Sequence, residues 1–121
     1  MLKEVRDVRQ VTGDAPRRVF FSEDLDLTVW FDDREDILGF ELCYDKETNE
    51  RAVRWNRNEG FLHQKVDDGE NRPGRHKSTP ILVPDGVFPV QKTSRLFLEN
   101  SRDIDQSIAK FIYRKLLEYP A

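Results

Sequence analysis

The sequence has one cysteine, no long apolar run and none of the short motifs that mark a metal or nucleophile site. Cys43, alone among 121 residues, excludes an internal disulfide and any cysteine-rich metal centre. No stretch approaches the roughly 18–20 apolar residues of a membrane span. The N-terminal MLKEVRDVRQ lacks the apolar segment of a signal peptide. These absences predict a cytoplasmic domain with no membrane partner.

An excess of one charge is also missing. The chain has 20 Lys and Arg against 23 Asp and Glu, so its net charge is −3, and both signs are interspersed. Proteins that bind nucleic acid usually show a basic face or a high isoelectric point. We therefore expect no nucleic-acid partner. The charged fraction of 36% exceeds the usual quarter and predicts a densely ionic surface.

The chain from residue 17 to residue 67 shows the alternation of apolar and polar residues that is typical of strands. In DLDLTVWFD, Leu25, Leu27, Val29 and Phe31 share one face. Short turns between such segments favour antiparallel hairpins, because parallel neighbours need long crossovers. We expect a single domain over 1–121, with a β-meander of four to five strands, and we assign no structure to residues 1–16 and 87–99.

The best helical pattern lies near the C-terminus, over residues 101–119, with Asn100 or Ser101 as the expected N-cap. Six apolar residues fall within a sector of about 140°, namely Ile104, Ile108, Phe111, Ile112, Leu116 and Tyr119. Lys115 lies inside the same sector. We expect Lys115 to extend its ammonium to the edge of this sector. The helix needs an apolar partner, which predicts an α+β fold with the helix packed on the meander.

The sheet face away from this helix is the predicted binding surface. Parity places Trp30, Glu41 and Cys43 on it. If Leu62 and Val66 point to the core, Phe61, His63 and Lys65 lie on it as well. Aromatic side chains beside ionisable ones are common at interfaces and ligand sites. The parity of the strand over residues 51–55 is open: either Val53 and Trp55 or Ala52 and Arg54 lie on this face. The alternative is that residues 79–83 or the N-terminus cover Trp30 and Phe61.

No catalytic or metal-binding residue is predicted. His63 and Asp67 share a strand face but lie about 13 Å apart along it, too far to bind one ion. Cys43 and His63 are expected two strands apart, about 9.5 Å, which leaves the thiol without a base in contact. We therefore expect neither a metal nor another cofactor.

The charged segment GFLHQKVDDGENRPGRHKSTP, residues 60–80, contains both histidines of the chain. Strand geometry divides it into a strand to about Asp67 and a charged loop over 68–79. Arg72, Arg75 and His76 could bind an anion there. Three nearby carboxylates oppose this, and the Gly, Pro and charge content favours a mobile loop.

Four phrases, DLDLTVWFDD, GFELCYDKETNERAVRW, GFLHQKVDDGE and TPILVPDG, together with the C-terminal helix, resemble a family of small uncharacterised bacterial proteins. The likeness spans about residues 19–117 and implies a bacterial, cytoplasmic, single-domain protein. It implies no activity for any residue.

These observations favour a small non-enzymatic binding or protein-interaction domain that self-associates as a homo-oligomer through the open sheet face or a sheet edge. The alternative is a small enzyme or small-molecule-binding protein with its site on the same face, around Trp30, Cys43 and His63.

Overall fold

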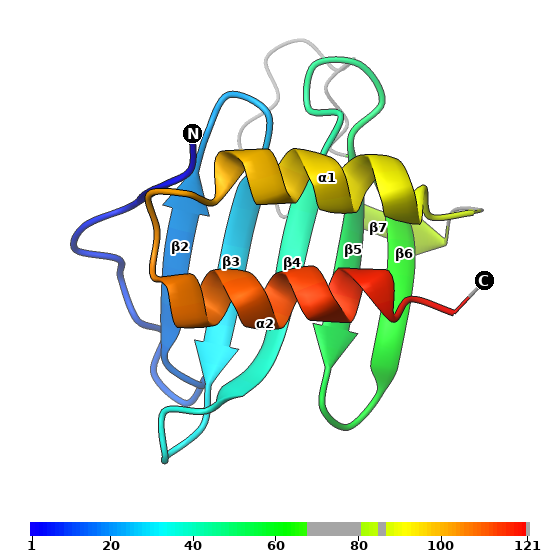
Figure 1. Ribbon diagram of the computed structural model, residues 1–121. Helices are drawn as coiled ribbons and strands as arrows, with labels where there is room; N and C mark the ends of the chain where they lie inside the picture. The colour runs from blue at the N-terminus through cyan, green and yellow to red at the C-terminus, as the bar shows by residue number, and fades with distance from the viewer. Residues whose placement is uncertain (68–80, 85–86, 121) are drawn as a thin grey trace, which may run out of the picture.

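The computed structural model describes residues 1–67, 81–84 and 87–120, and it has two layers (Figure 1). One layer is an antiparallel sheet whose strands follow the chain order from β1 to β7. The other is a pair of helices, α1 (Val90–Asn100) and α2 (Gln106–Leu117), which lie side by side across one face of the sheet. The predicted α+β class is therefore confirmed.

The sheet has more strands than the four to five predicted. Its members are β1 (Lys3–Glu4), β2 (Arg17–Phe21), β3 (Asp26–Phe31), β4 (Ile37–Tyr44), β5 (Arg51–Asn56), β6 (Gly60–Asp67) and β7 (Ile81–Pro84). β1 and β7 are the short additions at the two edges. The sequence predicted no structure for the N-terminus. It packs against the end of α1, because Leu2 is fully buried and its N–H donates to the Asn100 carbonyl at 2.8 Å.

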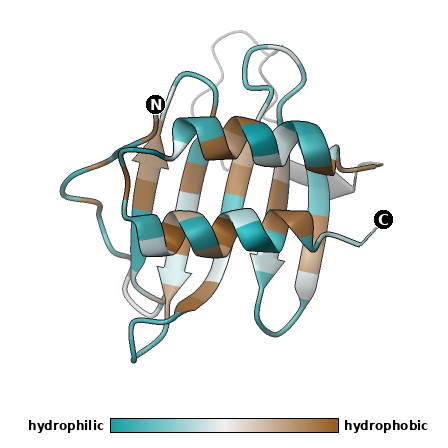
Figure 2. Ribbon diagram, viewed as in Figure 1, coloured by the Kyte–Doolittle hydropathy of each residue, from teal (hydrophilic) through white to brown (hydrophobic). Residues whose placement is uncertain are grey.

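Alternation sets which side chains face the helices. Leu27, Leu42 and Val53 stand opposite one another on β3, β4 and β5, and all three have no exposed surface. Figure 2 shows apolar residues on the central strands beneath the two helices. The alternation over residues 25–31 thus correctly predicted the core face of β3.

Side-chain caps shape the tight turns between strands. Asp32 Oδ1 accepts the backbone N–H groups of Arg34 and Asp36, at 2.8 and 2.9 Å, and fixes the turn from β3 to β4. Asn56 Oδ1 plays the same part before β6, where Gly60 takes a positive φ of 81°. These polar residues end the strands because their side chains replace ladder hydrogen bonds.

The C-terminal region differs from the prediction in two ways. α1 lies in a region to which the sequence assigned no structure. Its helical pattern is weak because Thr93, Ser94 and Asn100 are on its buried face, and Pro89 provides no side-chain cap. α2 begins later than residue 101, since Asp105 is its N-cap and accepts the Ser107 N–H at 3.0 Å. The apolar stripe predicted for this helix does face the sheet, with Ile112 and Leu116 fully buried.

No helix in the described ranges is long and apolar enough to cross a membrane.

Candidate functional site

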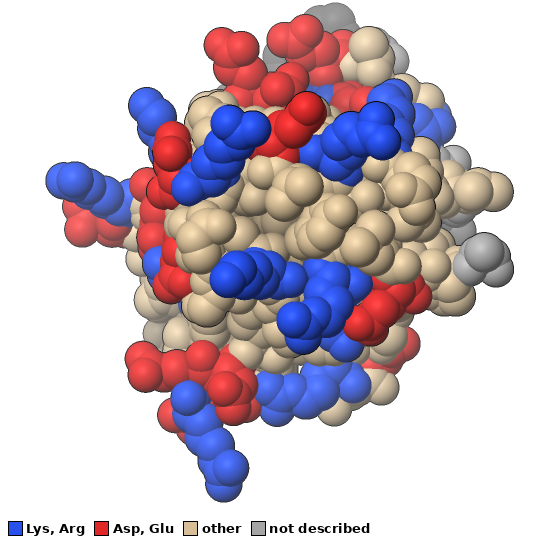
Figure 3. All heavy atoms as spheres, viewed as in Figure 1, with Lys and Arg blue, Asp and Glu red and all other residues tan. Residues whose placement is uncertain are grey.

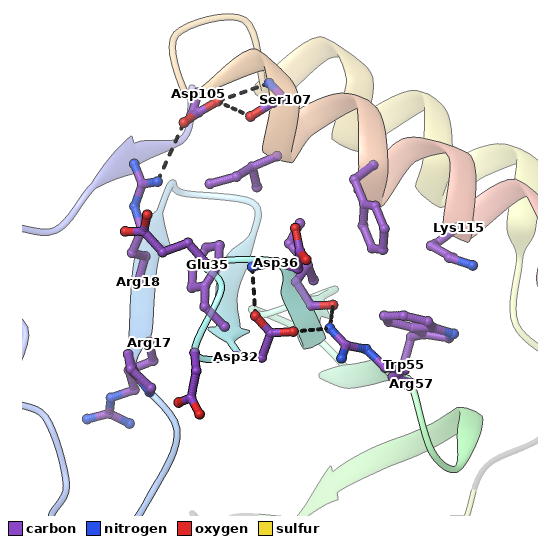
Figure 4. Close-up of a pocket in the computed structure, with 16 residues that line it drawn as sticks. Arg17, Arg18, Asp32, Glu35, Asp36, Trp55, Arg57, Asp105, Ser107 and Lys115 are labelled. Atoms are coloured by element: carbon purple, nitrogen blue, oxygen red, sulfur yellow. Dashed lines mark hydrogen bonds and ion pairs between the residues drawn. The ribbon is translucent and has the colours of Figure 1, made fainter.

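A groove of about 1020 Å³ opens between the turn from β3 to β4 and the first half of α2 (Figure 4). We call it the hairpin–helix groove. Its apolar surface comes from both layers, namely Phe31, Ile37, Trp55, Ile108 and Phe111, and charged residues surround it. A concave apolar surface with a few polar groups is the usual form of a binding site.

Trp55 and Phe111 form the apolar wall of the groove. Their rings meet edge to face, with centroids 5.5 Å apart at 64°, and both remain partly exposed. Lys115 lies with its ammonium 4.7 Å from the Trp55 ring centre. This contact explains why a lysine sits inside the apolar sector of α2, because an aromatic face attracts a cation.

The opposite lip of the groove is the acidic turn at residues 32–36. Its anchor is Asp32, whose Oδ2 accepts from the Arg57 guanidinium at 2.8 Å. The hydrogen bond from Arg57 lowers the pKa of the Asp32 carboxyl, and the hydrogen bonds from the backbone amides of Asp36 and Arg34 lower it further. Arg57 also donates to the Ile37 carbonyl at 3.1 Å, so it ties the turn to β5.

Arg18 lies at the third side, where β2 approaches the start of α2. It donates to Glu4 at 2.6 Å and lies 3.5 Å from the Asp105 carboxylate. This hydrogen bond raises the pKa of Arg18 and lowers the pKa of Glu4. The pKa of Asp105 is lowered chiefly by its bonds from Ser107.

The remaining charge at the groove is negative. All its cations have acceptors within the protein: Arg18 and Arg57 have carboxylates, Lys115 has Glu118 at 3.3 Å, and Arg17 donates to the Arg9 carbonyl. By contrast, three carboxylates of the acidic lip make no ion pair or hydrogen bond within the described part of the chain, namely those of Asp33, Glu35 and Asp36. Figure 3 shows Asp and Glu side chains gathered below the start of α2, over this turn.

Three of the predicted site residues do share the sheet face away from the helices. Trp30, Glu41 and Cys43 lie there, and Glu41 accepts a hydrogen bond from Arg54 of the neighbouring strand. The Cys43 thiol lies 3.9 Å from the Glu41 carboxylate. Burial, helped by that negative charge, raises the pKa of Cys43, which opposes thiolate chemistry.

The prediction that His63 and Lys65 lie on this face is wrong. Asn56 pairs with Gly60 across the turn, which places Phe61, His63 and Lys65 on the helix side with Trp55 and Val53. Leu62 instead points to the open face and is 44% exposed. Both faces of this strand carry apolar residues, so alternation alone left its parity undetermined.

His63 is a core residue, only 3% exposed. Its Nε2 shares a hydrogen bond with the Tyr44 hydroxyl, and its ring stacks on that of Tyr44 with centroids 5.9 Å apart. Phe88 and Tyr119 complete the aromatic surroundings. An imidazole with a polar partner can be buried in this way. Cys43 and His63 therefore point to opposite faces of the sheet.

The loop predicted to bind an anion, with Arg72, Arg75 and His76, lies outside the described residues. In the ranges that the structure does describe, no group of three or more His, Cys, Asp or Glu residues could hold a metal ion.

Comparisons with family models, with curated proteins and with solved structures found no match to this chain.

Sequence reasoning missed the hairpin–helix groove, although two of its signals were visible. The turn DDRED, residues 32–36, is rich in carboxylates, and Lys115 interrupts the apolar sector of its helix. The sequence did not reveal that Trp55 lies beside this turn and Lys115, because the parity of its strand was left open.

Proposed function

We propose that this protein is a non-enzymatic binding domain that holds a segment of a partner protein in the hairpin–helix groove. The observation that carries the proposal is the partly exposed Trp55–Phe111 pair, which forms the wall of a 1020 Å³ groove. Aromatic side chains in a concave site supply most of the binding energy in protein recognition.

The charged groups around the groove support recognition rather than catalysis. Asp32, Arg57, Arg18 and Asp105 are engaged in ion pairs that stabilise the walls. Such pairs keep a site rigid before the ligand arrives, which lowers the entropic cost of binding.

The experiment is a selection of random 12-residue peptides on the folded protein. We expect the selected peptides to lose about tenfold in affinity on Phe111→Ala, because one aromatic contact contributes about 1–2 kcal/mol. The matched control is Leu117→Ala on the same helix, since Leu117 is 44% exposed and does not line the groove. Binders indifferent to Phe111→Ala, or a selection without binders, would contradict the proposal.

Self-association is a second candidate, as the exposed apolar residues of the open sheet face favour it. Phe21 and Leu62, on this face, are 55% and 44% exposed. They lie on β2 and β6, on either side of the Asp26–Lys46 and Glu41–Arg54 pairs. Sedimentation equilibrium would detect a dimer, and Phe21→Glu with Leu62→Glu should dissociate it. A wild-type protein that stays monomeric up to about millimolar concentration would contradict it.

A further inference from the structure

We infer that the segment bound in the hairpin–helix groove is cationic, with Lys or Arg side chains beside apolar ones. This inference rests on the proposed binding function and adds the chemistry of the partner. It follows from the difference between the two sides of the groove, one apolar and one acidic.

The acidic lip supplies the charge complementarity. Asp33, Glu35 and Asp36 are exposed and have no ion pair or hydrogen bond from their carboxylates in the described part of the protein. A ligand cation can therefore approach them without first breaking an internal pair. An anionic ligand would face these three charges, while the cations that line the groove are already bound to acceptors.

The geometry also gives the ligand a direction. Trp55 and Phe111 offer apolar contact at one side, and Lys115 above the Trp55 ring would repel a cation there. The cations of the ligand thus belong at the turn from β3 to β4, and its apolar side chains against α2. A short segment with alternating basic and apolar residues meets both requirements.

Isothermal titration calorimetry can compare three peptides that differ only in charge. The first has the core Lys-Phe-Lys-Leu-Lys, and the others carry Glu or Gln in place of each Lys. We expect the Lys peptide to bind at least tenfold more tightly than either and to weaken as salt is raised, because exposed charges are screened.

Two triple variants test the carboxylates themselves. Asp33→Asn with Glu35→Gln and Asp36→Asn should weaken the Lys peptide about tenfold, as each exposed ion pair contributes about two- to threefold. Glu23→Gln with Glu47→Gln and Glu99→Gln removes the same charge from exposed residues that do not line the groove. This control should change the affinity less than about threefold, through long-range charge alone.

The outcomes separate the two proposals. Peptides that bind equally well, or a Glu peptide that binds best, would overturn the cationic inference. If that binding still fell on Phe111→Ala, the groove would remain the site. If no peptide bound and the selected 12-residue peptides were indifferent to Phe111→Ala, the inference and the proposed function would both be wrong.

Discussion

The two faces of the sheet carry one tryptophan each, and the surroundings of these residues differ. Trp55 faces α2, where it contacts Phe111 and Lys115 at the wall of a groove. Trp30 lies on the open face, where its partner on β4 is Gly39, and the nearby charges of Glu41 and Arg54 bind each other. The same residue type is thus part of a groove on one face and part of a surface with internal ion pairs on the other.

A mixed aromatic and charged composition therefore does not by itself locate a binding site. On the open face, Asp26 and Glu41 form ion pairs with Lys46 and Arg54, so these charges are already bound within the protein. At the groove, three carboxylates have no ion pair within the described ranges and lie beside an apolar wall. Concavity and unused charge distinguish the two faces better than composition does.

The largest expected difference between the faces is in stability. Leu42→Ala removes a fully buried side chain on the helix side and should cost about 2–5 kcal/mol in the free energy of unfolding. Leu62→Ala is the same substitution on the open face, where the side chain is 44% exposed, and should cost about 1 kcal/mol or less. Urea unfolding of both variants measures the contrast. Equal losses would contradict the assignment of the two faces.

Gly39→Ala should have the next largest effect. A Cβ at this position would lie 2.6 Å from the Trp55 backbone oxygen, so β4 and β5 would have to separate. We expect a loss of about 1–3 kcal/mol, typical of overpacking, although the residue points to the open face. Thr28→Ala on the same face is the control, and its loss should be smaller. A neutral Gly39→Ala in thermal unfolding would show that the strands lie further apart.

Cys43 should react slowly with thiol reagents. Burial raises its pKa, so the thiolate fraction at pH 8 is small. We expect alkylation of the native protein to be more than about tenfold slower than that of free cysteine, and to recover in denaturant. A native thiol that reacts as fast as free cysteine would indicate that the open face is less closely packed than described.

The smallest expected effect is the acid titration of the groove lip. The folded-state pKa of Asp32 lies below its usual 3.8, so its contribution to the turn is fully present above pH 4. It is lost as the pH falls through the lowered value. The amide shifts of Arg34 and Asp36 should follow that titration, and Asp32→Asn should abolish it. A midpoint at or above 3.8 would contradict the ion pair with Arg57.

Much of the fold could be predicted from the sequence, because alternation and short turns are local signals. The alternation over residues 25–31 predicted its core face correctly, and the apolar stripe of α2 predicted its packing. α1 was missed because its buried face includes Thr93, Ser94 and Asn100, which hide the period of the helix.

The candidate site was predicted less well because it depends on register. The prediction for His63 was wrong because it depended on Leu62 and Val66 pointing to the core, whereas the register places Leu62 on the open face. The groove brings together side chains from β3, β5 and α2, and no local pattern reports that Trp55 and Phe111 meet. Both the face of His63 and the contact of Trp55 with Phe111 depend on how segments distant in the sequence pair and pack.

The most direct test of the central claim uses the two tryptophans as separate reporters. Trp30→Phe leaves Trp55 as the only indole, and Trp55→Phe leaves Trp30, since the chain has two Trp in all. Each variant is titrated with the Lys-Phe-Lys-Leu-Lys peptide, and its emission is followed. The account predicts a saturable change in Trp55 and a constant signal from Trp30. A change in Trp30 with a constant Trp55 would place binding on the open face and contradict it.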